Sequence, residues 1–218
     1  MSEPSASAPE HDVFEGIYGR YRMTAEDAQE VQRYRQSLLL CGITFVGGMG
    51  QWLAWGPAHV GLWLLPMAIG LGLALHWIHI YLRPLHRALQ ILWAIGCVGL
   101  SWLALESGSE PMVTSVSDQP LWIWAIGPFF AALAGVGFKE FFCFRRPEAI
   151  GLTLLLPMAL LGYLSGLMGA ALSGGLLLLA AVLQLVLALR KFGGPAAADV
   201  GDKSVFAYLE AHRMARNA

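Results

Sequence analysis

Two histidines are the ionisable side chains that lie deepest in the long apolar stretches of this sequence. His76 and His79 are three residues apart, so on one helix they would share a face, which Arg83 and His86 would continue. Ionisable groups at membrane depth are costly and are therefore candidates for function. Imidazole is a good ligand for several metals. The pair thus predicts a metal site or an axial ligand to haem or chlorophyll.

A second group of reactive side chains occurs in the segment GFKEFFCFRRP. Lys139 and Cys143 are four residues apart and would share a helical face, with Glu140 beside them. Glu140 or Cys143 could complete a metal site with the two histidines. The structural alternative has neutral histidines hydrogen-bonded to a neighbouring helix, with Lys and Arg anchoring the membrane interface. No established metal or enzyme motif is present, so the sequence favours a non-enzymatic protein.

The chain that carries these residues has the composition of a membrane protein. Hydrophobic residues make up 56% and charged residues 13% of its 218 residues, whereas soluble domains have about 45–50% and about 25%. Its long charge-free segments divide at Gly and Pro into six stretches of roughly 20 residues, the length of helix that crosses a bilayer. We therefore predict an all-α, polytopic membrane protein with six transmembrane helices, near residues 37–55, 60–82, 86–105, 120–138, 150–168 and 172–190.

The basic residues predict the orientation of these helices. All 14 Lys and Arg residues lie in the N-terminal segment, the second and fourth connections, and the C-terminal tail. The first, third and fifth connections have none. Because Lys and Arg near span ends remain on the cytoplasmic side, we expect both the N and C termini to be cytoplasmic.

The segments outside the apolar stretches suggest a three-part organisation. Residues 1–36 would be a cytoplasmic segment with a disordered start, a hairpin over 13–23, and a helix that begins near Ala25 and runs into the first span. Residues 37–190 would form the transmembrane domain, with a loop as its third connection. Residues 191–218 would be a cytoplasmic tail, either containing a short amphipathic helix on the membrane surface or only partly ordered.

The best functional interpretation is an accessory, assembly or stabilising factor for a larger membrane complex. The lipid bilayer and such a complex are the expected partners, and no nucleic acid is expected. One alternative is a haem-, chlorophyll- or metal-binding protein that uses His76 or His79. Another is a small-solute channel or carrier, supported only by prolines within spans. The candidate interaction site on the cytoplasmic face comprises Arg83, His86, Lys139, Glu140, Cys143, Arg145, Arg146, Asp202 and Lys203.

Three segments together resemble a known family. They are HIYLRPLHRALQ (79–90), FKEFFCFRRPE (138–148) and GDKSVFAYLE (201–210). They are similar to a family of uncharacterised integral membrane proteins found in cyanobacteria and plastids, and the resemblance extends over residues 13–210. It implies an oxygenic phototroph and a thylakoid or cytoplasmic membrane, with a photosynthetic complex as a candidate partner. It assigns no catalytic residue.

Overall fold

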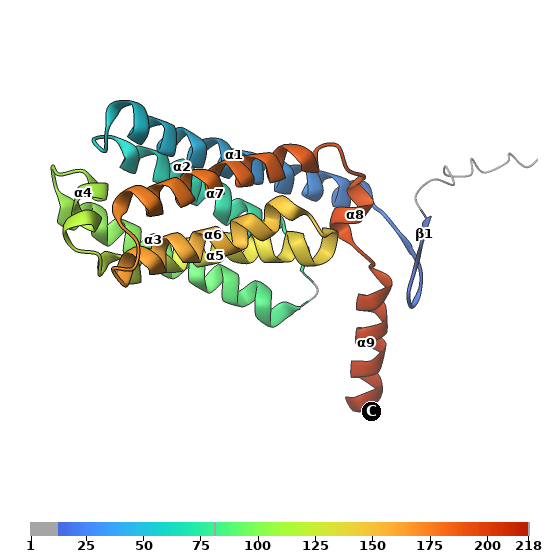
Figure 1. The fold of residues 1–218 in the computed structure, drawn as a ribbon. Coiled ribbons are helices and arrows are strands. Elements are labelled where there is room, and N and C mark those ends of the chain that lie inside the picture. The colour runs from blue at the N-terminus through green and yellow to red at the C-terminus, as the bar shows by residue number, and fades with distance from the viewer. Residues whose placement is uncertain (1–12, 81, 218) are drawn as a thin grey trace, which may run out of the picture. The chain divides into compact units, whose positions relative to one another are not determined.

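The computed structural model describes residues 13–80 and 82–217, which are almost entirely helical (Figure 1). Its elements are β1 (Val13–Gly16), β2 (Gly19–Arg22), α1 (Ala25–Trp55), α2 (Val60–Trp77), α3 (Arg83–Ser107), α4 (Met112–Asp118), α5 (Trp122–Phe144), α6 (Pro147–Leu164), α7 (Ala170–Lys191), α8 (Ala196–Val200) and α9 (Ser204–Asn217). The chain divides into two compact units. One is the helical bundle, residues 33–193; the other is the terminal unit, whose described residues are 13–32 and 194–217.

Six helices in the described part of the chain are long and apolar enough to cross a membrane: α1, α2, α3, α5, α6 and α7. Helices suit this environment because they satisfy their backbone hydrogen bonds internally, which lipid cannot do for them. The predicted fold class, an all-α protein with six membrane-spanning helices, is therefore confirmed. The side of the membrane on which each terminus lies stays a prediction.

Close backbone contacts hold the bundle together. Helix α3 packs against α5, α5 against α6, and α6 against α7. At Gly96 and Gly99 the backbone of α3 comes so close to α5 that an added Cβ would collide with Phe129 or with the carbonyl oxygen of Ala125. Small residues are what such contacts require in a membrane, because helices there associate by packing rather than by the hydrophobic effect.

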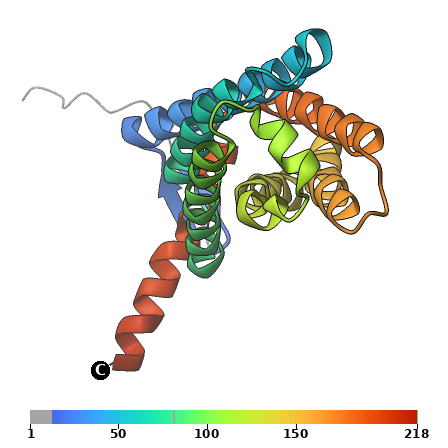
Figure 2. The same ribbon diagram turned by 90° about the vertical axis from the view of Figure 1, so that its left-hand side faces the viewer.

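The third connection differs from the loop expected there, because seven of its residues form the helix α4. The amide of Ser115 donates to the carbonyl of Pro111, which closes the first turn. The hydroxyls of Ser107 and Ser115 are 2.7 Å apart, which joins α4 to the end of α3. Met112 and Val116 pack against the hydrophobic core. Figure 2 faces this end of the bundle, which we call the α4 end.

The terminal unit brings together the two ends of the chain. Residues 13–23, where a hairpin was expected, contain the antiparallel strands β1 and β2, joined by a two-residue turn between the paired Gly16 and Gly19. Helix α1 starts with a capping box: the Thr24 amide donates to Asp27 Oδ2 at 2.7 Å, and the Asp27 amide donates to Thr24 Oγ1 at 3.2 Å. Strand β2 contacts α9 from the tail.

Candidate functional site: a buried ion network

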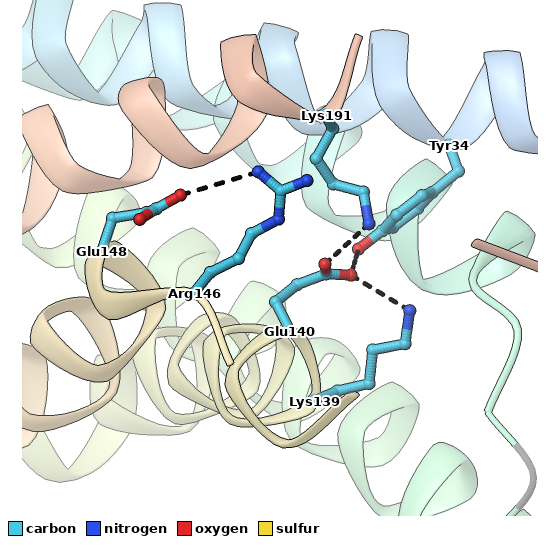
Figure 3. A network of polar contacts seen from close by, with 6 residues as sticks. All are labelled: Tyr34, Lys139, Glu140, Arg146, Glu148 and Lys191. Carbon is cyan, nitrogen blue, oxygen red and sulfur yellow. Dashed lines mark hydrogen bonds and ion pairs between the residues drawn. The ribbon is translucent and has the colours of Figure 1, made fainter. Parts of the chain in front are cut away.

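Four side chains from three helices meet inside the bundle, at the end where α5 and α7 finish (Figure 3). The last turns of α5 supply Lys139 and Glu140, and the last residue of α7 is Lys191. Tyr34 reaches them from α1. We call these four residues the ion network. Lys residues are common at the ends of membrane spans, where their amines normally extend towards water.

The carboxylate of Glu140 is at the centre of the ion network. Its Oε1 accepts hydrogen bonds from Tyr34 Oη at 2.7 Å and from Lys139 Nζ at 3.0 Å. Its Oε2 accepts one from Lys191 Nζ at 2.6 Å. Both oxygens are therefore engaged by donors, and two of these three donors are cations. Charge-assisted bonds of this kind are about twice as strong as neutral ones.

The ion network is almost completely excluded from the bundle surface. Glu140 is 0% exposed and Lys191 is 1% exposed, and Lys139 is also buried. The two ammonium groups lie near the rings of Tyr34 and Phe144, at 4.3–5.4 Å from the ring centroids. These aromatic faces provide favourable cation–π contacts to two buried cations that share one carboxylate.

A second carboxylate joins the neighbouring helices α6 and α7. Glu148 Oε2 accepts a hydrogen bond from Arg190 Nη1 at 2.8 Å. Its Oε1 is 3.8 Å from Arg146 Nη1, an ion pair that Figure 3 shows beside the ion network. Glu148 is in the first turn of α6, where a negative charge is also favoured by the helix dipole.

This arrangement is suited to fastening helices rather than to chemistry. Tyr34, Lys139 and Lys191 engage three of the about four lone-pair sites of the Glu140 carboxylate, which leaves little capacity for a metal. A general base must likewise be free to accept a proton, and this carboxylate is held by two cations. The ion network instead joins α1, α5 and α7 at one end of the bundle. Sequence reasoning identified Lys139 and Glu140 but missed Tyr34 and Lys191.

The two histidines singled out in the sequence do not share a helical face. His76 is in the last turn of α2 and is exposed, with its ring edge-on to Trp77. The helix ends at Trp77, and Ile78 is extended with ψ of 130°, so His79 lies beyond the helix. The span expected over residues 60–82 is therefore shorter, and the common face was wrong. Whether either histidine binds haem, chlorophyll or a metal stays a prediction.

The ring of His86 helps to explain the early end of α2. His86 Nε2 is 2.7 Å from the carbonyl oxygen of Leu75 and Gln90 Nε2 is 3.4 Å from it, so two side chains from α3 bond a carbonyl of the last turn of α2. Last-turn carbonyls lack partners within their own helix and need such donors. His86 is therefore tied to α2, whereas Arg83 is exposed.

The predicted interaction residues of the fourth connection divide into two sets. Cys143 and Arg145 are exposed and Arg146 is half-buried. Lys139 and Glu140, by contrast, are buried in the ion network and are not available at a surface. Each of the two offsets part of the cost of burying the other's charge, and their place in the predicted cytoplasmic-face interaction site stays a prediction. A partner at the remaining residues stays a prediction.

Asp202 and Lys203 fasten the terminal unit together. Asp202 Oδ2 accepts from the Ile17 amide at 2.6 Å, and Oδ1 accepts from the Ser204 hydroxyl at 2.6 Å. These hydrogen bonds, first that of Ser204 and then that of Ile17, hold the pKa of Asp202 below its usual value. Lys203 Nζ donates to Asp27 Oδ2, which joins the tail to the first turn of α1.

Comparison with protein families gives a match over much of this architecture. The model of a family described as uncharacterised integral membrane protein, DUF2301, matches residues 73–208. The chain belongs to this family. The DUF2301 match includes Lys139, Glu140 and Lys191 but not Tyr34, and it is narrower at the N-terminal side than the expected resemblance over 13–210. This DUF2301 protein is thus a multi-pass integral membrane protein. No curated protein and no solved structure is significantly similar to it.

Proposed function

We propose that this DUF2301 protein is a non-enzymatic accessory factor that binds a larger membrane complex through its terminal unit. The observation that carries the proposal is that the two ends of the chain fold together into one unit outside the long apolar stretches. The Ile17 amide donates to Asp202, the Tyr18 amide donates to Ser204 Oγ at 3.0 Å, and the rings of Tyr18 and Tyr208 stack at 4.0 Å. Two termini joined in this way form a defined surface rather than two free tails.

The surface of the terminal unit carries large apolar side chains that the unit itself does not cover. Ile17 is 82% exposed at the turn of the hairpin, and Met214 is 67% exposed on α9. Tyr18 and Leu209 are also exposed. Clusters of exposed apolar side chains rimmed by polar ones are typical of interaction surfaces. A protein partner that covers Ile17 and Leu209 would remove this apolar area from water.

The proposed setting follows from charge and resemblance. Six spans put both termini on one side, and the distribution of Lys and Arg favours the cytoplasmic or stromal side. The partner would therefore be met on that side of a thylakoid or cytoplasmic membrane. The motifs that resemble proteins of cyanobacteria and plastids support a photosynthetic complex as that partner.

Site-specific cross-linking in native membranes tests the proposal. A photoreactive amino acid at position 17 of the full chain should give a discrete cross-linked protein, and the same partner should appear from position 209. Ile17→Glu combined with Leu209→Glu should abolish co-purification of that partner in mild detergent, because both side chains would be charged where the partner is apolar. Glu15→Ala is the control, because it removes only the exposed pair with Arg20 on the same hairpin.

Two results would contradict the proposal. One is cross-linking from position 17 to lipid alone, which would make the terminal unit a membrane-surface anchor. The other is recovery of the same partner, in the same amount, with the doubly charged variant as with wild type.

A further inference from the structure

The α4 end of the bundle contains a cavity of about 160 Å³, far along the helices from the ion network. It lies among residues of all seven helices α1 to α7, and most of the side chains that line it are apolar. An apolar cavity of about 150 Å³ is large enough to hold a benzene ring and stays free of water without one. The volume therefore suits one small ring rather than a folded acyl chain.

The walls of the cavity are rich in aromatic rings and thioethers. Phe45, Trp52, Trp63 and Phe130 contribute rings, and three methionines contribute sulfur, namely Met49, Met67 and Met112. Aromatic rings pack against one another in offset or edge-on geometries, and thioether sulfur contacts ring edges favourably. A wall of this composition favours a flat, unsaturated ligand over a saturated one.

One hydroxyl in the cavity wall lacks a partner. Ser173 is 5% exposed, and its Oγ has no hydrogen-bond partner among the residues that the structure describes. The other hydroxyls in the wall are engaged with backbone carbonyls: Thr44 with Leu40, Ser117 with Val113, and Tyr163 with Ser117. Buried polar groups are nearly always hydrogen-bonded. Ser173 is thus placed to bond an oxygen atom of a bound molecule.

We propose that the cavity binds a neutral, membrane-soluble ring that carries one hydrogen-bonding oxygen, as in a phenol or a quinone. The rings and sulfur atoms of the wall would contact the ring of the ligand, and Ser173 Oγ would bond its oxygen. A charged ligand would lack a counter-charge, because none of the described residues that line the cavity is Asp, Glu, Lys or Arg. The hydroxyl of Ser173 can donate to a quinone carbonyl or accept from a phenol.

Tryptophan fluorescence provides the measurement, because Trp52 and Trp63 line the cavity. The full chain in lipid nanodiscs would be titrated with 4-bromophenol and with tetramethyl-1,4-benzoquinone. Bromobenzene, which has the same ring as 4-bromophenol without the oxygen, would be the third probe. Saturable quenching is expected for 4-bromophenol or the quinone. The probe that binds more tightly shows whether the Ser173 hydroxyl acts as an acceptor, for the phenol, or as a donor, for the quinone. Unbrominated phenol should compete with 4-bromophenol.

Three variants separate the cavity from its surroundings. Ser173→Ala should weaken binding of the oxygen-bearing probe about tenfold, as expected for one lost hydrogen bond, and leave bromobenzene unchanged. Gly174→Leu should abolish saturable quenching, because Gly174 lines the cavity and a larger side chain there would fill it. Gly175→Leu is the matched control, because a Cβ at this next residue would have no atom of the described chain within 4 Å.

The outcomes distinguish this proposal from simple partitioning into lipid. The proposal would be overturned if quenching of the wild-type protein did not saturate, or if phenol did not displace 4-bromophenol from it. Both results come from the wild-type protein, so they hold even if Gly174→Leu failed to fold. Equal weakening of both brominated probes by Ser173→Ala would also overturn it, because the hydroxyl would then have no role in recognition.

Discussion

Replacing Glu140 by Gln should destabilise the bundle more than any other single change in the ion network. The carboxylate is fully buried and bonded to two buried ammonium groups, so its loss would take the counter-charge from Lys139 and a charge-assisted hydrogen bond from Lys191. Removing one partner from a buried ion pair costs roughly 3–5 kcal/mol. We expect Glu140→Gln to lower the free energy of unfolding by this amount.

The other members of the network should have smaller effects. Tyr34→Phe removes one hydrogen bond to a charged group, which contributes about 1.5–3 kcal/mol. Lys191→Met leaves Glu140 paired with Lys139 and bonded to Tyr34, so the remaining network is neutral. Its cost should therefore be below that of Glu140→Gln. The ranking follows from which charges stay buried without a partner, not from the number of hydrogen bonds lost.

A combined variant separates charge from packing. Lys139→Met, Glu140→Leu and Lys191→Met together remove every charge of the network and keep similar side-chain volumes. Buried ion pairs replaced by apolar residues are often neutral or stabilising, so the triple variant should recover most of the stability that Glu140→Gln loses. The control is Glu15→Gln in the exposed pair with Arg20, which should change stability by less than about 0.5 kcal/mol.

Reversible unfolding in mixed micelles of increasing SDS content would measure these differences. If Glu140→Gln unfolds at the same SDS fraction as wild type, Glu140 is not the counter-charge of two buried lysines. If the triple variant is as unstable as Glu140→Gln, the loss reflects packing instead of unpaired charge.

Further predictions concern packing, pH and orientation. Gly99→Ala should destabilise by about 1–3 kcal/mol in the same assay because its Cβ meets a carbonyl of α5, whereas Gly50→Ala, whose Cβ meets nothing within 4 Å, should be neutral. The hydrogen bond from the Ile17 amide to Asp202 should be intact above the ordinary Asp pKa and should be lost as the pH falls through the lowered pKa of Asp202. Its loss would be seen as faster hydrogen exchange of the Ile17 amide, and Asp202→Asn should remove this pH dependence. Cysteines at Glu110 and Arg145 should react with an impermeant maleimide from opposite sides of the membrane, and labelling of both from one side would contradict the predicted orientation.

The fold could be predicted because lipid imposes a simple rule on sequence. Each span needs about 20 residues without charge, and the gaps between charged residues supply six such stretches. The end of α2 was not predictable in the same way. No Pro or Gly stands between Trp77 and His79, and the side chains of His86 and Gln90 that bond the carbonyl of Leu75 arrive from another helix.

The ion network was predictable only in part for a similar reason. A Glu within FKEFFCF is a carboxylate in an apolar segment, which requires a cationic partner. That signal identifies Glu140 and its neighbour Lys139. Lys191 is 51 residues away and Tyr34 is 106 residues away along the chain, so only the packing of α1, α5 and α7 identifies them.

The ion network and the cavity share helices but should act independently. Ser173 and Lys191 are both on α7, and at 1.5 Å per residue the positions 173 and 191 are about 27 Å apart. Substitutions separated by more than about 10 Å, without shared partners, usually have additive effects on stability. The effects of Glu140→Gln and Ser173→Ala on unfolding should therefore add. At a given concentration, a ligand bound at Ser173 should raise stability by the same amount in wild type and in Glu140→Gln, because the network fixes one end of α7 whether or not the cavity is filled.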